Sequence, residues 1–79
     1  MNLSPQEAQA RVDEARALLR AAERERDAAF AAWYAEQLAH EGRAHGLYAR
    51  LAREAGLSVE LRQSVINAVK RGRAASPSR

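Results

Sequence analysis

The sequence predicts an all-α fold with one long N-terminal helix, two short helices and a tri-helical core. No glycine or proline occurs between Pro5 and Gly42. The intervening residues are mostly alanine, leucine, arginine, glutamate and glutamine, which have high helix propensities. Beyond Gly42, apolar residues recur at three- and four-residue spacing in two short segments, and this is the period of an amphipathic helix.

The first helix is expected from about Pro5 to about His40. Ser4 can cap its N-terminus, Pro5 suits the first helical position, and Glu7 completes a capping box. At a rise of about 1.5 Å per residue, this helix is near 50 Å long. It is therefore too long to be covered by the short helices that follow.

This helix carries two separate apolar zones. The first is a short, alanine-rich coiled-coil seam, which consists of Val12, Ala15, Leu18, Leu19 and Ala22. The second, within about residues 28–40, contains Phe30, Trp33, Tyr34 and Leu38. A chain of 79 residues buries only one small core. We therefore expect residues 1–41 to act as a dimerisation arm, with the aromatic zone packed on the short helices.

The second helix is expected from about His45 to Ala55, and the third from about Val59 to Arg71. Gly42 should end the long helix, and Gly72 should cap the third. Residues 73–79 have no apolar anchor and are expected to form a disordered basic tail. The apolar residues of the third helix that should face the core are Leu61, Val65 and Val69.

The connection between the two short helices has residues typical of a tight corner. Ala52 is small enough for another helix to pack against it, and Gly56 can adopt the left-handed conformation that turns the chain. Ser58 is a good N-cap for the next helix.

This pattern resembles the helix-turn-helix superfamily, and specifically small DNA-binding regulators of actinobacterial, plasmid or phage type. The resemblance covers about residues 42–72 and implies that the third helix enters the DNA major groove. One position departs from the family pattern. Arg62 stands where an apolar residue usually faces the core, and Leu61 is expected to take that place, through a shortened turn or a rotated third helix.

Charge is distributed unevenly along the chain. Residues 1–41 contain five arginines and eight acidic residues, a net charge of −3, whereas residues 42–79 contain eight basic and two acidic residues, a net charge of +6. The two parts together give the +3 of the whole chain. This asymmetry favours contact between the C-terminal half and a polyanion.

The outer face of the third helix is expected to carry amides and cations. Gln63 and Asn67 can pair with an adenine edge, and Arg62 with a guanine or a phosphate. Lysine and arginine at the end of the helix suit phosphate contacts. The expected DNA-binding residues are Ser58, Arg62, Gln63, Asn67, Lys70, Arg71 and Arg73, together with Arg43, Arg50 and Arg53 on or near the second helix.

Other chemistry has weak support in the sequence. There is no cysteine, and His40 and His45 are five residues apart with Gly42 between them, unlike a helical zinc pair. We therefore expect no metal, no cofactor and no enzymatic activity. No apolar stretch is long enough for a membrane span, and no leader pattern is present, so a cytoplasmic, nucleoid-associated protein is expected.

Two functions from different classes fit these observations. The first is a sequence-specific protein that binds double-stranded DNA, as a small homodimeric transcriptional regulator. The alternative is a helical protein-interaction module, such as an adaptor, an antitoxin-like protein or a phage-encoded inhibitor. That module would bind a protein partner through the N-terminal helix.

Overall fold

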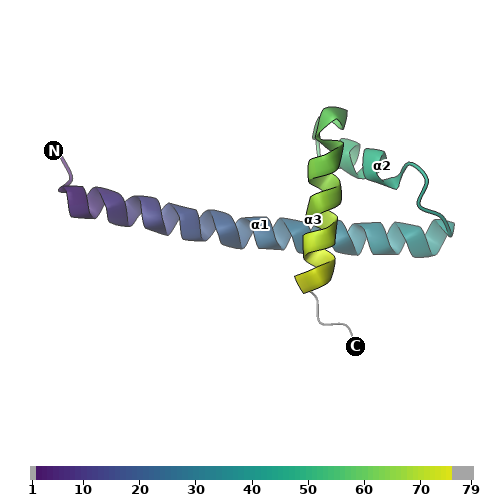
Figure 1. The fold of residues 1–79 in the computed structure, drawn as a ribbon, viewed down its shortest axis with the longest axis horizontal. Helices are drawn as coiled ribbons and strands as arrows, with labels where there is room; N and C mark the ends of the chain where they lie inside the picture. Colours follow the sequence, from purple (N-terminus) through teal and green to yellow (C-terminus); the bar gives the residue numbers. More distant parts are fainter. Residues whose placement is uncertain (1, 76–79) are drawn as a thin grey trace.

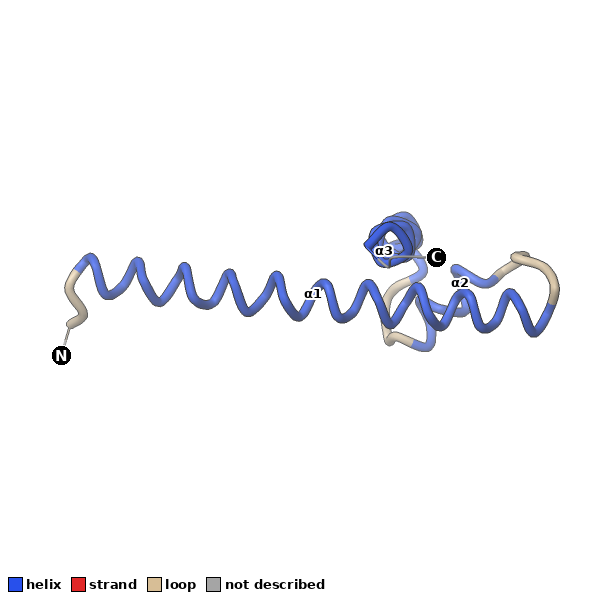
Figure 2. Tube along the Cα trace, turned by 90° about the horizontal axis from the view of Figure 1, so that it is seen from below, coloured by secondary structure: helices blue, strands red, loops and turns tan. Residues whose placement is uncertain are grey.

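The computed structural model describes residues 2–75, which contain no strand. Its elements are α1 (Pro5–Glu41), α2 (Leu47–Glu54), the short 3-10 helix η1 (Val59–Leu61) and α3 (Arg62–Ala75). α2 and α3 pack on the C-terminal part of α1, and the N-terminal part extends beyond them as a bare rod (Figure 1). Figure 2 shows α3 nearly end-on, lying across one face of α1. The all-α prediction is confirmed.

The ends of α1 form as the sequence predicts. Ser4 and Glu7 make a capping box, in which the Ser4 hydroxyl accepts a hydrogen bond from the Glu7 N–H. The backbone N–H of Ser4 donates to the Glu7 carboxylate, and this bond helps to lower the pKa of Glu7. At the other end, Gly42 adopts a left-handed conformation with φ 77° and donates its N–H to the Leu38 carbonyl.

The core is the predicted tri-helical one. Its buried residues come from all three helices, namely Tyr34, Leu47, Leu51, Ala52, Val65 and Val69. Phe30, Trp33 and Leu38 pack around them and are partly buried. The rings of Tyr34 and Tyr48 are stacked with their centroids 4.6 Å apart, which joins α1 to α2. The aromatic zone of α1 therefore packs on the short helices, as predicted.

The corner between α2 and α3 also follows the prediction. Gly56 is left-handed with φ 76°, and the Leu57 N–H donates to the Ala52 carbonyl over 2.8 Å. The Ser58 hydroxyl accepts a hydrogen bond from the Glu60 N–H. The helix before this corner is shorter than expected, because it begins only after Gly46, which also has a positive φ.

The prediction that Leu61 faces the core is wrong, because its side chain is 43% exposed. Arg62 is exposed as well, so neither residue fills the apolar position of the helix-turn-helix pattern. The reason is η1, whose tighter winding changes the direction of side chains before α3 begins. Leu57 before this turn and Val65 after it pack into the core instead.

The prediction that Gly72 caps the third helix is also wrong. Gly72 is buried within α3, which continues to Ala75. A Cβ atom at this position would lie 2.1 Å from the Asp27 carbonyl oxygen, so the glycine allows α1 and α3 to cross closely. Residues 73–75 of the expected tail are therefore helical, and residues 76–79 lie outside the described residues.

Among the elements of residues 2–75, no helix combines the length and the hydropathy that a bilayer span requires.

Candidate nucleic-acid interface

The exposed face of α3 carries a polar stripe. Gln63, Asn67 and Lys70 are all exposed and follow one another at four- and three-residue spacing, so they share one side of the helix. The opposite side is the buried one and consists of Val65, Ala68, Val69 and Gly72. The core thus fixes the direction of the stripe, which points away from α1.

Two amides of this stripe are already oriented by a mutual hydrogen bond. The Gln63 Nε2 donates to the Asn67 Oδ1 over 3.1 Å. The bond leaves the Gln63 Oε1 as an acceptor and the Asn67 amide N–H groups as donors. An adenine edge in the major groove presents a donor at N6 and an acceptor at N7, which is the complementary pattern.

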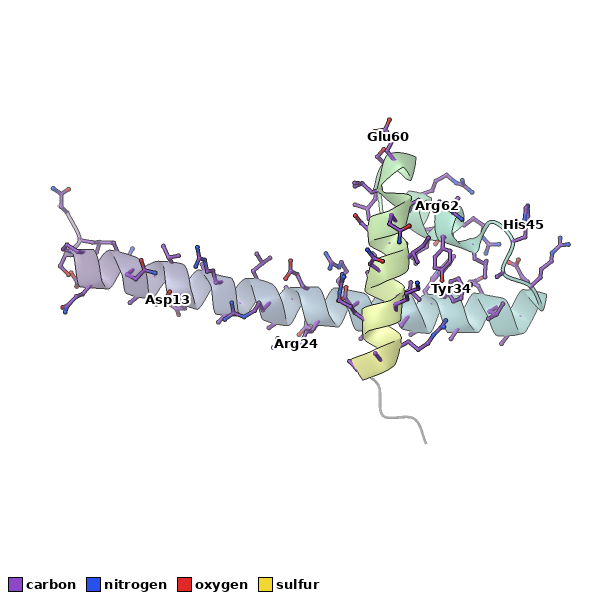
Figure 3. The ribbon with its side chains drawn as sticks, in the orientation of Figure 1. Asp13, Arg24, Tyr34, His45, Glu60 and Arg62 are labelled. Atoms are coloured by element: carbon purple, nitrogen blue, oxygen red, sulfur yellow. The ribbon has the colours of Figure 1, made fainter. Side chains whose placement is uncertain are left out.

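Cations flank the stripe on both sides. Arg62 is exposed at the start of α3 (Figure 3), and the Arg73 guanidinium lies 5.6 Å from the centroid of the Tyr34 ring. Figure 3 also shows Glu60 at the far tip of the η1–α3 segment, pointing away from the body of the protein. The carboxylate of Glu60 therefore does not cover the polar stripe of α3.

Arg71 is held on the other flank by Asp27, a buried residue that the sequence analysis missed. The Arg71 Nε lies 2.9 Å from the Asp27 Oδ2, and Arg26 donates to the Asp27 Oδ1. The hydrogen bond from Arg71, assisted by Arg26, lowers the pKa of Asp27 although burial opposes this. Asp27 lies seven residues before Tyr34, on the same stripe of α1. This spacing is the one feature of the sequence that could have indicated its burial.

The remaining predicted DNA-binding residues do not gather at the stripe. Arg50 is turned toward α1, where it bonds Glu41 and Gln37 and lies 5.6 Å from the centroid of the Trp33 ring. Arg43 is exposed in the loop between α1 and α2, and Arg53 is exposed on α2. The Ser58 hydroxyl is engaged with the backbone of η1.

The structure adds two arginines that the sequence analysis did not select. Arg20 and Arg24 lie on α1 before the point near Asp27 and Ala31 at which α3 crosses it, and Figure 3 labels Arg24. They border a hollow of about 440 Å³, which is lined by Arg20, Glu23, Arg24, Arg26, Asp27 and Arg71. A second hollow, of about 280 Å³, is lined in part by Arg26, Asn67 and Arg71. The cationic surface thus extends from α3 onto α1.

The predicted dimerisation seam lies on the bare part of α1 (Figure 1). Leu18 is 66% exposed, Leu19 58% and Val12 43%. Ala15 and Ala22 are exposed as well. The single chain therefore leaves this apolar strip in contact with water.

Among residues 2–75, no three histidine, cysteine, aspartate or glutamate side chains gather as metal ligands would. Comparison of the chain with family models, with curated proteins and with solved structures finds no match.

Proposed function

We propose that this protein is a sequence-specific DNA-binding protein, acting as a small dimeric transcriptional regulator. The observation that carries the proposal is the outward stripe of Gln63, Asn67 and Lys70 on a helix whose other side is fixed by the core. A short helix held in this way, with its polar side free, has the dimensions that the major groove admits.

The residues of the stripe and its flanks have different roles in this proposal. Gln63 and Asn67 read an adenine through the free atoms of their hydrogen-bonded amides. Arg62 contacts a guanine or a phosphate. Lys70 and Arg73 contact phosphates and fix the register of the helix on DNA. Arg71 reaches a phosphate only at the flank, because Asp27 holds its guanidinium.

A binding measurement at two salt concentrations tests the proposal. The apparent association constant for a duplex should fall steeply with salt, with a slope in the logarithmic plot of about −0.9 per phosphate contact. Fluorescence anisotropy with a selected site and with a pool of random duplexes gives affinity and specificity together. A response to salt that is flat for both duplexes contradicts DNA binding.

Variants of the stripe separate base reading from charge. Replacing Gln63 and Asn67 by alanine should reduce the preference for the selected site by about 1–3 kcal/mol and leave binding to the random pool nearly unchanged. Lys70→Ala should weaken binding to both duplexes by the same factor. Equal losses from the two kinds of variant would contradict the assigned roles.

A protein-interaction module is the second candidate function, and the exposure of Val12, Leu18 and Leu19 favours it. In this case the seam binds a different protein, and the purified chain is a monomer. Light scattering distinguishes the two, because a regulator that dimerises through the seam scatters as a pair. If the protein is the dimeric regulator, Leu19→Asp should abolish its self-association. If it is the interaction module, Leu19→Asp should abolish binding of its protein partner.

A further inference from the structure

The face of α1 that carries the seam is covered by α2 further along the helix. Trp33 lies two heptads after Leu19 and so continues the seam positions of the helix. Arg50 of α2 lies over the Trp33 ring and bonds Gln37, one turn further on. Two parallel α1 helices that met along the seam would therefore each run into α2 of the other chain.

We infer that the N-terminal arms of two copies pair in the antiparallel direction, centred near residue 17. In this register the whole seam of one chain covers the whole seam of the other. Val12 lies beside Ala22 of the partner subunit, and Leu19 lies beside Ala15 of the partner subunit. Each layer formed by Val12, Ala15, Leu19 and Ala22 then contains one larger side chain and one alanine, so the two helices keep an even separation, and Leu18 flanks these layers. A parallel pair would alternate Val–Val or Leu–Leu layers with Ala–Ala layers.

The charges beside the seam agree with this direction. In the antiparallel register, Arg11 faces Glu25 of the partner subunit, and the symmetry gives this attraction twice. In a parallel pair, Arg11 faces Arg16 of the partner subunit twice, because residues that flank the seam meet five positions apart. The antiparallel pair has one contact between like charges, where Arg16 meets its own copy on the symmetry axis.

The antiparallel pair places both α3 helices on one side. Asp27 and Tyr34, which contact Arg71 and Arg73 of α3, project about a quarter of a turn away from the seam, at about 100° per residue. The two-fold axis of an antiparallel pair is perpendicular to both helices, so it keeps both polar stripes facing the same way. In a parallel pair they would face in opposite directions.

The spacing of the two α3 helices then matches DNA. Gly72 crosses α1 between Asp27 and Ala31, near residue 29. This point is twelve residues, or about 18 Å, from the centre of the pair, so the two crossings are about 36 Å apart. One turn of B-DNA separates half-sites by about 34–36 Å. A shift of one heptad would change the spacing by about 10 Å.

Arginines occupy the surface between the two crossings. Arg20 and Arg24 border the hollow that Arg71 also lines, so they face the side on which α3 lies. In the pair they meet the phosphates between the half-sites. This part of the inference rests on the proposed DNA-binding function, whereas the direction of the pair does not.

Cross-linking tests the direction, because the natural sequence has no cysteine. Chains carrying V12C or A22C are oxidised separately and as a mixture. We expect a mixed disulfide between the two variants and little cross-linking of either alone, since a position and its own copy are about 15 Å apart along the pair. Cross-linking of A22C to itself overturns the inference, and so does a lack of any cross-link.

A charge exchange gives a second test. Arg11→Glu and Glu25→Arg should each raise the dimer dissociation constant about tenfold in sedimentation equilibrium, and the double variant should restore it. Glu14→Arg, which lies away from the seam, is the control. Tighter association of the Arg11→Glu chain would indicate a parallel pair and overturn the inference.

These tests separate the dimer from the DNA-binding function, because they need no DNA. Cross-linking of A22C to itself, in a protein that binds DNA, overturns the inference and leaves the proposed function intact. The expected cross-link in a protein that does not bind DNA overturns the proposed function alone. Where both hold, duplexes with half-sites about 10 base pairs apart should bind at least tenfold more tightly than duplexes with half-sites about 15 base pairs apart.

Discussion

Gly72 lies directly against the main chain of Asp27. A Cβ atom at Gly72 would be 2.1 Å from the Asp27 carbonyl oxygen and 3.0 Å from the Ala31 Cβ. The first of these contacts is with backbone, which cannot move aside as a flexible side chain can. The crossing of α1 and α3 therefore depends on the missing side chain of one residue.

Gly72→Ala should lower the free energy of unfolding by about 1–3 kcal/mol, because the added methyl group forces the two helices apart. The sign of this stability change is informative, because at an uncrowded helical position alanine is more stabilising than glycine by about 1 kcal/mol. Urea denaturation followed by far-UV circular dichroism measures the change. Ala74→Gly, at an exposed position of the same helix, should also destabilise, by about 0.5–1 kcal/mol. Stabilisation by Gly72→Ala would contradict the close crossing.

Asp27→Asn should destabilise the protein by about 1–3 kcal/mol near pH 7, because the buried carboxylate bonds Arg71 and Arg26. The pKa of Asp27 in the folded state is below its usual value of 3.8. A lowered folded pKa means that the stabilisation is present above about pH 4 and is lost as the pH falls through the folded pKa.

Urea denaturation of both proteins at pH 6 and at pH 3 measures this effect. The difference in unfolding free energy between the native chain and Asp27→Asn should be larger at pH 6 than at pH 3. Glu36→Gln, at an exposed position of the same helix, is the control and should show no such trend. A difference that grows toward low pH would show that the carboxylate is not stabilised by the arginines.

Much of this fold follows from local sequence signals. The capping box at Ser4, the left-handed Gly42 and Gly56, and the apolar spacing of α1 each act within a few residues, so the sequence alone indicates them. The partners of the aromatic zone follow as well, because Tyr34 and its neighbours are the largest apolar side chains available to the short helices.

What the sequence analysis missed depends on contacts between distant segments. Asp27 stands in a charged run, and only the crossing of α3 shows that it is buried with Arg71. Gly72 has the local pattern of a helix cap, but its neighbour across the crossing keeps it inside α3. From the sequence, Arg50 is expected to be a free surface cation. Its hydrogen-bond partners on α1, Glu41 and Gln37, are 9 and 13 residues away in the chain.

Tyr34→Ala should unfold the short helices together with the part of α1 that carries them. Tyr34 is 5% exposed and stacks on Tyr48, and loss of a buried aromatic ring costs about 3–5 kcal/mol. Emission from Trp33, the single tryptophan, reports on this region during thermal unfolding. Tyr34→Phe keeps the ring and should retain the native transition. An unchanged melting curve for Tyr34→Ala would contradict the tri-helical core.

Gly56→Ala should destabilise the corner by about 1–2 kcal/mol through its backbone conformation alone. A Cβ atom at Gly56 meets no atom within 4 Å, so the cost comes from the positive φ of 76° and not from a clash. Gly56→Asn should cost less, because asparagine tolerates the left-handed region better than alanine. Thermal denaturation of Gly56→Ala and Gly56→Asn measures which of the two variants is the more stable. Equal stability of Gly56→Ala and the native chain would contradict the left-handed turn.

Lys70→Gln and Arg50→Gln remove the same charge from two different environments. Lys70 is exposed on the stripe of α3, so its loss should weaken DNA binding and make the logarithmic salt slope less negative by about 1, without changing the melting temperature. Arg50 bonds Glu41 and Gln37 and lies over Trp33, so its loss should lower the melting temperature by a few degrees. Its effect on the salt slope should be absent. Anisotropy titrations measure the salt slope of both variants, and thermal melts measure their melting temperatures. A changed salt slope for Arg50→Gln and an unchanged one for Lys70→Gln would show that α2, rather than α3, faces the DNA.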